Sequence, residues 1–452
     1  MDIPFGVQSY QHRSKPLSSQ SLVNCYLEQA PQQARTPVAV VMAYGIDEFA
    51  QGLAGTCRGA LVRNGVCYAV IGTSLVTISS GGVVVSLGSI GGAGPVDIAG
   101  DETNLMIVTG STDYAYDGST VAAITDADYP GADWVAYLDG YFIVSRNGQF
   151  YISGNRNPRT WEALDFASAE KHPDNIVDGT VDHSELILFG VESGEIWHNT
   201  GEADFPISKS ESGDFEIGIY CKGAHCRTDN TVFFLGHDGV FYRLEGYTPV
   251  RVSTHAIEQA VEDAEDKSFR CLSWKEGGHT FVSVGSTDFT FVYDVATQLW
   301  HQRKSYGYDY WRANFIVRCY NKWLVGDSLS AKVGALDPRT FTEFGDVLRC
   351  SAVSPAIANG NKKLRHSKLQ LVFETGVGLV SGQGSNPQVM IRWSNNGGRT
   401  WSNEKWRSIG AIGEYQQGVQ INRVGQAKDR IYEYAISDPV PRTLISASVE
   451  VQ

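Results

Sequence analysis

Apolar runs followed by short polar turns recur along most of the chain. Each run is joined, through two to four polar or glycine residues, to a second run in which apolar and polar residues alternate. This pattern is typical of β-hairpins. Seven such segments begin near residues 59, 104, 137, 184, 230, 279 and 321. The chain is therefore expected to be all-β.

The spacing of these segments indicates how the hairpins pack. Their starts are separated by roughly 35 to 50 residues, which is the period of four-stranded propeller blades. A single sheet cannot bury both of its faces, whereas blades stacked around an axis bury them and leave only short edges. We predict a β-propeller of six or seven blades over residues 56–346, because one unit could belong to a neighbouring subdomain. A pair of β-sandwiches is the alternative.

The pattern differs at both ends of the chain and at one point within it. Residues 1–55 lack the repeat and hold four prolines, which predicts an extended arm that completes or clasps the propeller. After residue 347 the runs lengthen, which predicts a C-terminal β-sandwich-like domain over 347–452. Residues 253–265 predict the one helix, with Ile257 and Val261 on its apolar face and Ser253 or Thr254 as its cap.

The segment "SNNGGRTW" at 394–401 resembles the Asp-box turn of sialidases and other β-propellers. Asn396 stands at the Asp position, and glycines tolerate the positive φ that such a turn needs. Asp-boxes are structural elements even in sialidases, so we interpret this one as a hairpin turn. Its residues are Ser394, Asn396, Gly397, Gly398, Thr400 and Trp401.

The segment "GDSL" at 326–329 copies the nucleophile block of GDSL-type hydrolases. That family needs a downstream Asp-x-x-His, and the one downstream histidine, His366, has Lys363 three residues before it. Asp327 and Ser328 are therefore expected in a turn rather than in a catalytic site.

The segment "CKGAHC" holds Cys221, His225 and Cys226, which are residue types that bind zinc. No second Cys/His pair with ligand spacing accompanies them, so a strand end with a buried thiol is the favoured interpretation. We predict no catalytic residues, no metal and no cofactor.

Composition and charge narrow the class of protein. The 452 residues carry a formal net charge of −13, which argues against electrostatically driven binding of nucleic acid. Eight scattered cysteines suggest reduced thiols made in a cytosol. The chain begins without a basic-then-apolar signal region, and its apolar runs are shorter than a membrane span.

Two polar segments are the candidate subunit interface. The first lies in the arm and has low hydrophobicity, as expected for a segment that becomes ordered on a neighbour. The second is a basic stretch in an acidic chain, which could meet an acidic subunit or DNA, or be a solvated edge strand. The residues are Gln8, Tyr10, His12, Arg13, Lys362, Lys363 and Arg365. The helix at 253–265 and the C-terminal domain are further candidates. Deleting residues 1–20 is expected to leave the fold intact and to impair assembly.

Several segments, in collinear order over nearly the whole chain, resemble the packaged-DNA stabilisation proteins of P22-like short-tailed phages, also called head-completion or tail-hub proteins. One departure is Tyr44, where that family has Pro. The segments are "LVNCYLEQ" (22–29), "AYGIDEF" (43–49), "CRGAL" (57–61), and residues 93–117, 139–177, 239–261 and 392–415.

The resemblance implies a structural virion protein made in the bacterial host cytoplasm. Such proteins form a ring, usually of six copies, below the portal and its adaptor. The ring extends the DNA channel, helps retain packaged DNA and carries a fibre, needle or tailspike. A carbohydrate-active propeller, either sialidase-like or a lectin, is the alternative, and a cellular interaction scaffold is a third possibility. The sialidase-like alternative predicts a pocket of clustered arginines and paired carboxylates.

Overall fold

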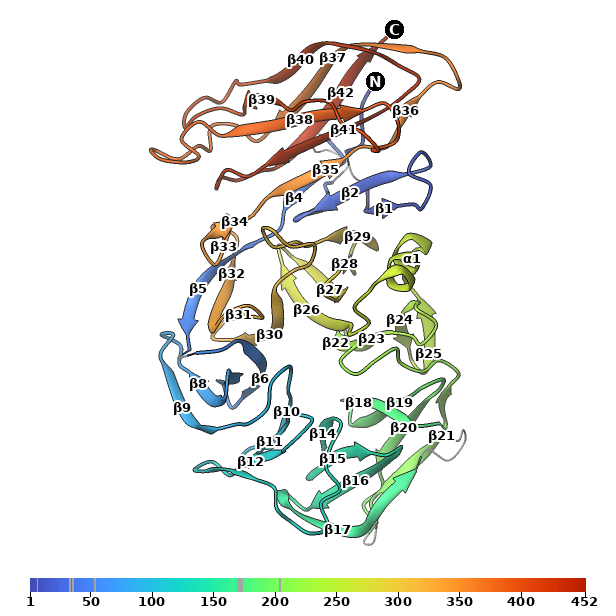
Figure 1. Ribbon diagram of the computed structural model, residues 1–452, viewed down its shortest axis with the longest axis vertical. Helices are drawn as coiled ribbons and strands as arrows, with labels where there is room; N and C mark the ends of the chain where they lie inside the picture. The colour runs from blue at the N-terminus through green and yellow to red at the C-terminus, as the bar shows by residue number, and fades with distance from the viewer. Residues whose placement is uncertain (6, 32–33, 35, 53, 169–173, 203–204) are drawn as a thin grey trace.

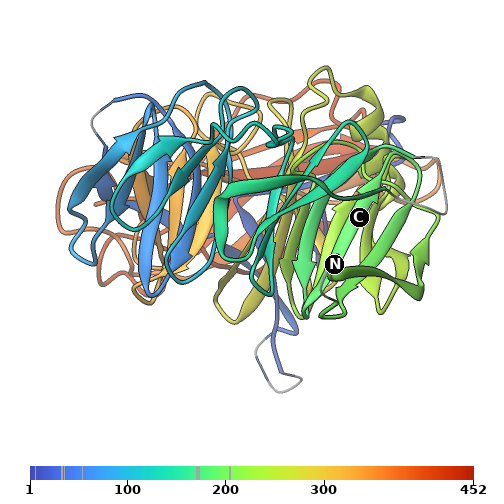
Figure 2. The ribbon, with the colours of Figure 1, turned by 90° about the horizontal axis from the view of Figure 1, so that it is seen from below.

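Two β-rich parts make up the computed structural model, which describes residues 1–452 apart from 6, 32–33, 35, 53, 169–173 and 203–204. A ring of small sheets surrounds a central axis, and a two-layered sandwich lies beside the ring (Figure 1). Seen from below, the strands of the ring stand side by side with the sandwich behind them (Figure 2). The predicted all-β propeller with a C-terminal sandwich is confirmed.

The ring has seven blades, and each of the seven predicted hairpin units lies in a different blade. In blades 1 to 6 the strand nearest the axis comes first in sequence and the following strands pair antiparallel, moving outward. Blade 1 consists of β6 (Cys57–Arg63), β7 (Val66–Ile71), β8 (Ser74–Ile78) and β9 (Val84–Ser89). Blade 2 consists of β10 (Asp97–Gly100), β11 (Leu105–Val108), β12 (Tyr114–Tyr116) and β13 (Val121–Ala123). Blade 3 consists of β14 (Val135–Leu138), β15 (Tyr141–Arg146), β16 (Gln149–Gly154) and β17 (Asn157–Ser168).

Blades 4 to 6 repeat the same order. Blade 4 consists of β18 (Ile176–Asp182), β19 (Glu185–Gly190), β20 (Gly194–Asn199) and β21 (Ile207–Phe215). Blade 5 consists of β22 (His225–Thr228), β23 (Thr231–Leu235), β24 (Phe241–Glu245) and β25 (Thr248–Arg251). Blade 6 consists of β26 (Arg270–Glu276), β27 (His279–Gly285), β28 (Thr290–Asp294) and β29 (Leu299–Gln302).

The seventh blade is completed by the N-terminal arm. Strands β30 (Ala313–Cys319), β31 (Lys322–Asp327) and β32 (Lys332–Asp337) come from one end of the propeller sequence. The fourth strand is β5 (Gly45–Gln51), which pairs antiparallel with β32 from Gly45↔Asp337 to Gln51↔Lys332. Two-residue strands β33 (Thr342–Glu343) and β34 (Asp346–Val347) extend this sheet. The ring is thus closed by backbone hydrogen bonds between residues almost 300 positions apart.

The rest of the arm belongs to the sandwich. In one sheet, β3 (Cys25–Gln29) and β4 (Val38–Met42) join β42 (Leu444–Val451), β37 (Leu364–Phe373) and β40 (Val419–Ala427). The other sheet contains β1 (Tyr10–Gln11), β2 (Ser19–Val23), β35 (Cys350–Val353), β36 (Ile357–Ala358), β41 (Asp429–Ile436), β38 (Gln388–Ser394) and β39 (Lys405–Ser408). Domain boundaries at residues 55 and 346 stay predictions, because the arm shares sheets with both parts.

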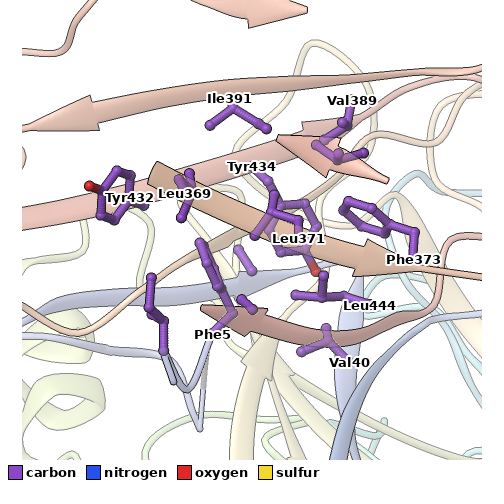
Figure 3. Close-up of a cluster of buried hydrophobic side chains, with 14 of the residues drawn as sticks. Phe5, Val40, Leu369, Leu371, Phe373, Val389, Ile391, Tyr432, Tyr434 and Leu444 are labelled. Carbon is purple, nitrogen blue, oxygen red and sulfur yellow. The ribbon is translucent and has the colours of Figure 1, made fainter. Parts of the chain in front are cut away.

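The sandwich core is closed by the first residues of the chain. Phe5 lies among Leu369, Leu371 and Tyr434, with its ring edge-on to Tyr434 at 5.3 Å between ring centroids (Figure 3). Ile3 is also buried, and its backbone N–H donates to the carbonyl of Ala447. The expectation that removing residues 1–20 spares the fold is therefore wrong, because the deletion opens the sandwich core.

Carboxylates in turns fasten neighbouring segments of the blades. Asp113, in the turn after β11, accepts hydrogen bonds from the backbone of Thr109 and Ala132 and from the Tyr129 hydroxyl. In blade 6, Asp288 and Asp266 each accept backbone hydrogen bonds from the other's loop. The buried N–H groups of Thr109 and Ala132 thereby gain a partner, which avoids the cost of leaving them unpaired.

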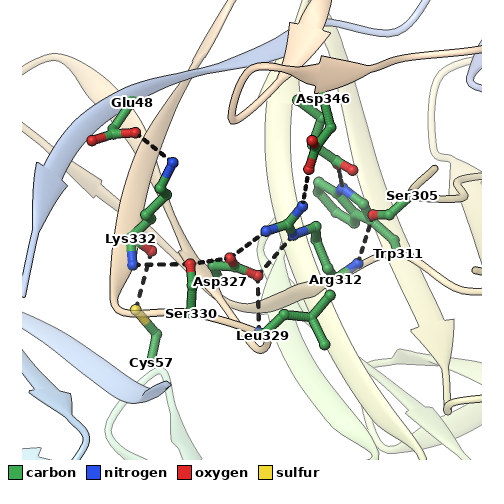
Figure 4. A network of polar contacts seen from close by, with 11 residues as sticks. Glu48, Cys57, Ser305, Trp311, Arg312, Asp327, Leu329, Ser330, Lys332 and Asp346 are labelled. Atoms are coloured by element: carbon green, nitrogen blue, oxygen red, sulfur yellow. Dashed lines mark hydrogen bonds and ion pairs between the residues drawn. The ribbon is translucent and has the colours of Figure 1, made fainter. Parts of the chain in front are cut away.

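A buried ion pair provides a corresponding link in blade 7. Arg312 holds Asp327 through two hydrogen bonds, Nε to Oδ1 at 2.8 Å and Nη2 to Oδ2 at 2.6 Å, and also pairs with Asp346 (Figure 4). Asp327 is completely buried and further accepts from the backbone of Leu329. Asp327 of the "GDSL" segment therefore stabilises a turn, as its sequence context indicated.

The one helix among the residues that the structure describes, α1 (His255–Asp263), lies between blades 5 and 6. Ile257 and Val261 are fully buried in the apolar core that these blades share. Thr254 occupies the N-cap position without a side-chain hydrogen bond to the helix. The Ser253 hydroxyl instead donates to Glu258 and accepts from the backbone of Phe241, which ties the first turn to β24.

We expect the Phe5→Ala variant to lose about 3–5 kcal/mol of unfolding free energy, because it leaves a cavity among well-packed side chains. Leu17→Ala is the matched control, since Leu17 is 66% exposed in the same arm. Urea denaturation of both variants measures the difference. Equal stabilities would contradict the assigned role of Phe5.

Blade 6 is joined to the arm by a histidine between two carboxylates. His279 Nδ1 lies 2.8 Å from Asp294 Oδ2, and its Nε2 lies 2.8 Å from Glu28 Oε2 on β3. The hydrogen bond to Asp294, opposed by burial and assisted by Glu28, raises the pKa of His279 from its ordinary 6.5 to about 9. The imidazolium is therefore favoured in the folded protein.

Since the folded pKa lies above the unfolded one, this stabilisation is complete below pH 6.5 and is lost as the pH rises through about 9. We expect the stability advantage of the natural chain over His279→Gln to shrink between pH 6.5 and pH 10. Urea unfolding of both proteins at the two pH values tests this. An advantage that stays constant would show that the charge of His279 contributes nothing.

Candidate assembly interface

The central channel of the propeller is lined by several charged side chains from different blades. The inner strands enclose about 460 Å³, with Asp178, His225 and Arg270 among the lining residues. His225 Nδ1 lies 3.0 Å from Asp178 Oδ2. Burial pushes the pKa of Asp178 upward, but His225 and the backbone N–H groups of Gly223 and Gly179 hold it below its usual value.

The channel charges are engaged with one another or with the backbone. Lys222 Nζ lies 2.7 Å from Asp97 Oδ2. Arg270 Nη1 donates to the backbone and side-chain oxygens of Asn314, both at 2.8 Å. The described residues thus give the channel no cluster of free arginines for a substrate carboxylate, although the sialidase-like alternative needs one. Their arrangement instead links the inner strands of blades 2, 4, 5, 6 and 7.

The two motifs considered for chemistry have local structural partners. Cys221 donates its thiol to the carbonyl of Phe269, and His225 pairs with Asp178. Among the residues that the structure describes, no group of three or more His, Cys, Asp or Glu side chains is arranged to hold a metal ion. His366 lies in the sandwich with its Nδ1 2.8 Å from the Tyr432 hydroxyl, remote from the "GDSL" turn in blade 7.

A polar groove of about 510 Å³ forms where three of the candidate interface segments meet. The arm, the helix and the sandwich each contribute a wall, and we call this hollow the arm groove. Its lining residues include Gln11, His12, Arg13, Lys15, Ala256, Gln259, Asp263, Lys304, Arg392, Gly398, Trp401 and Glu433.

The floor of the arm groove is a fixed ion pair beside an aromatic ring. Arg392 donates from Nε to Glu433 Oε2 at 2.7 Å, and its guanidinium lies 4.7 Å from the centroid of the Trp401 ring. Arg349 Nη2 lies 3.3 Å from the other Glu433 oxygen. The planar guanidinium of Arg392 therefore satisfies the buried carboxylate and stacks on Trp401 at the same time.

The mouth of the groove is cationic. Arg13 and Lys15 are exposed, and neither side chain has an ion-pair partner among the described residues. Lys304 is held by Asp309 at 3.0 Å. Since Arg392 is neutralised by Glu433, the groove keeps the positive charges of Arg13 and Lys15 and the single negative charge of Asp263, which is exposed on α1. A concave site with two free cations suits an acidic partner surface.

The structure brings only part of the predicted interface to this groove. His12 and Arg13 line it, and Tyr10 stacks on His12 with 6.4 Å between ring centroids. Gln8 is half-buried next to Ser9, whose N–H donates to Trp300 in blade 6, so the arm is already ordered on its own chain.

The basic stretch lies elsewhere. Lys362, Lys363 and Arg365 are exposed at the start of β37, where Arg365 pairs through its backbone with Gln452. They are not among the residues that line the arm groove.

The Asp-box-like hairpin connects β38 to β39 and touches the arm. Asn396 Oδ1 accepts from the Thr400 N–H at 2.9 Å and from the Ser394 hydroxyl at 2.8 Å, while its Nδ2 donates to Thr400 Oγ1. Gly397 and Gly398 have φ of 70° and 86°. Ser394 and Thr400 are therefore joined through Asn396.

The hairpin also holds the arm in place. Ser19 of β2 donates its hydroxyl to the carbonyl of Gly397 at 2.7 Å. An added Cβ at Gly397 would come within 2.9 Å of Pro16. Lys304, Arg392 and Glu433 were missed at the sequence level, because no local pattern connects residues that lie tens to hundreds of positions apart.

Comparison with known protein families covers both parts of the fold. The family described as "Bacteriophage P22 Gp10, beta-propeller" matches residues 1–341, and "Bacteriophage P22 Gp10, beta-sandwich" matches residues 349–452. The chain belongs to the bacteriophage P22 Gp10 family. It is therefore a P22-like head-completion protein, and thus a phage structural protein. The resemblance inferred from sequence segments is confirmed.

Other comparisons add little to the Gp10 assignment. No curated protein matches the chain. Among solved structures, the extracellular domain of the putative one component system BT4673 from B. thetaiotaomicron matches with a TM-score of 0.44 and 9% identity, over 88% of this chain and 59% of that one. PorZ of Porphyromonas gingivalis, a component of the type-IX secretion system, matches with a TM-score of 0.39 and 10% identity. The match covers 79% of this chain and 46% of PorZ.

The chain thus spans about half the length of these two structures. No helix among the described residues of this Gp10 family member is long and apolar enough to cross a membrane.

We expect Asn396→Ala to lower the unfolding free energy by about 1–2 kcal/mol, because the Thr400 N–H and the Ser394 hydroxyl lose their shared acceptor. Asn403→Ala is the control, since Asn403 is exposed in the same connection. Urea denaturation followed by tryptophan fluorescence compares the two variants. Equal effects would show that the hairpin does not depend on Asn396.

Proposed function

We propose that the chain forms a ring of six copies below the portal and adaptor of a short-tailed phage. The ring extends the DNA channel, helps retain packaged DNA and anchors the tail fibre, needle or spike. The observation that carries this proposal is the family match over residues 1–341 and 349–452, which spans both domains. The fold supports it, because a mechanical subunit benefits from sheets that are locked to each other.

Rigidity in this chain comes from strands shared between its parts. The sheet of blade 6 continues into the sandwich, because β2 pairs in parallel with β29 at Val23↔Gln302. Strand β5 closes the propeller while the preceding β3 and β4 belong to the sandwich. Rotation of one part against the other would break these backbone hydrogen bonds, so the chain transmits force as one body.

The net charge of −13 is compatible with a channel wall that repels DNA instead of gripping it. Because phosphate contacts need cations, we expect the purified protein to leave duplex DNA unbound even at low salt. Retention of DNA then depends on a mechanical plug formed with the partner proteins, and not on affinity of this subunit for DNA.

Mass measurement tests the assembly. We expect a monomer in isolation and six copies once the chain is docked on a portal–adaptor complex, with electron microscopy of intact virions showing the ring. DNA-filled heads that lack the protein should lose nuclease-protected DNA, and adding the purified chain should reduce this loss. Docking as single, separated copies would contradict the ring. Turnover of a glycan panel would favour the carbohydrate-active alternative.

A further inference from the structure

Strand β17, the outermost strand of blade 3, contains a four-residue bulge. Its pairing with β16 passes from Tyr151↔Phe166 to Ser153↔Trp161. Residues 162–165 therefore stand opposite Ile152 alone, and residues 162–164 are exposed at the outer edge of the blade. Bulges of this kind re-aim side chains and recur at functional edges. We call residues 162–165 the β17 bulge.

The β17 bulge presents an apolar side chain between two acids. Leu164 is 86% exposed, and Phe166 just beyond the bulge is 39% exposed. Glu162 and Asp165 have no ion-pair partner among the described residues, and partial burial together with the charge of Glu162 raises the pKa of Asp165. An isolated exposed leucine is ordinary. Here the leucine is combined with two unpaired carboxylates on an outer edge.

The arm groove has the complementary chemistry. Its mouth carries the free cations of Arg13 and Lys15, and its floor carries the Trp401 ring beside the Arg392–Glu433 ion pair. The carboxylates of Glu162 and Asp165 match those cations, and Leu164 has the Trp401 ring as its apolar contact. Filling the groove in this way leaves no charge of the bulge unpaired.

The two surfaces lie at different ends of the chain. Strand β17 is at the edge of the propeller farthest from the sandwich, while the groove lies where the arm and α1 face the sandwich (Figure 1). One copy therefore cannot satisfy its own bulge. A contact between two different surfaces is heterologous, and repetition of such a contact gives a ring when its rotation closes.

We propose that the β17 bulge of one copy docks into the arm groove of the next copy around the ring. This inference rests on the proposed ring and specifies its contact: Glu162 and Asp165 pair with Arg13 and Lys15, and Leu164 inserts against Trp401 and Arg392. The occupant of the groove is a second copy of this chain.

A charge-swap experiment tests the contact on portal–adaptor complexes. We expect the pair Arg13→Glu and Lys15→Glu to reduce ring assembly at least about tenfold, and the pair Glu162→Lys and Asp165→Lys to do the same, because each places like charges together. The chain carrying all four substitutions should regain most of the lost assembly. Recovery in the fourfold variant would not arise from general charge effects.

The control for the Glu162→Lys and Asp165→Lys pair replaces two other exposed acids, Glu202→Lys and Glu245→Lys. It changes the net charge by the same amount as that pair, but away from the β17 bulge. This variant should assemble like the natural chain. Thermal denaturation of all variants should show unchanged midpoints, because the altered side chains are exposed or partly exposed. Failure of the fourfold variant to recover, despite normal folding, would overturn the contact.

Photo-crosslinking separates failure of this contact from failure of the ring. A photoreactive phenylalanine analogue at position 164 should crosslink to the groove residues of a second copy in assembled complexes. The same analogue at Val83, which is 61% exposed in blade 1, should not. Rings that form while position 164 crosslinks to another virion protein, or to nothing, would overturn this contact and leave the ring intact. Absence of any ring in the natural chain would reject the proposed function itself.

Discussion

The antiparallel pairing of β5 with β32 is the constraint on which the rest of the structure depends. A propeller is stable only as a closed ring, because every blade covers the faces of its two neighbours. Without β5 the seventh blade would lack its outer strand, and the buried core between blades 7 and 1 would lose part of its cover. Ala50 of β5 belongs to that core, together with Cys57 of blade 1 and Val333 of blade 7.

The same arm that closes the ring also builds the sandwich. Ile3 and Phe5 fill the sandwich core, β2 joins one of its sheets, and β3 and β4 join the other. Glu28 on β3 then reaches His279 in blade 6. The arm thereby contributes apolar side chains to two larger cores and gains its order from both. Because the arm contributes strands to both parts, the propeller and the sandwich are connected by shared sheets and not by a flexible linker.

Polar groups buried within the ring stabilise the geometry of the fold. The Asp178–His225 pair, the Arg312–Asp327 pair and the hydrogen bonds of Arg270 all end on protein partners. Breaking such a pair by removing one member would cost about 3–5 kcal/mol, since the other charge would stay buried and unpaired. Their arrangement suits a particle component that must resist deformation. The unpaired charges of Arg13, Lys15, Glu162 and Asp165 are, in contrast, at the surface and available to a partner.

The sequence by itself determined the all-β class, the seven hairpin units and the helix at 253–265, because alternation and repeat spacing are local properties that survive without tertiary contacts. It also indicated the family, through the resemblance of collinear segments along nearly the whole chain. Tertiary structure alone decided which distant segments meet. Nothing local in Gly45–Gln51 indicates that it pairs with Lys332–Asp337, and nothing in the first residues places Phe5 in the sandwich core. The arm groove was likewise hidden, since its walls come from residues near 13, 260, 304, 392 and 433. Which strands pair is decided by the free energy of the whole packed chain. A local sequence pattern shows that a segment can form a strand, but it does not identify the strand with which that segment pairs.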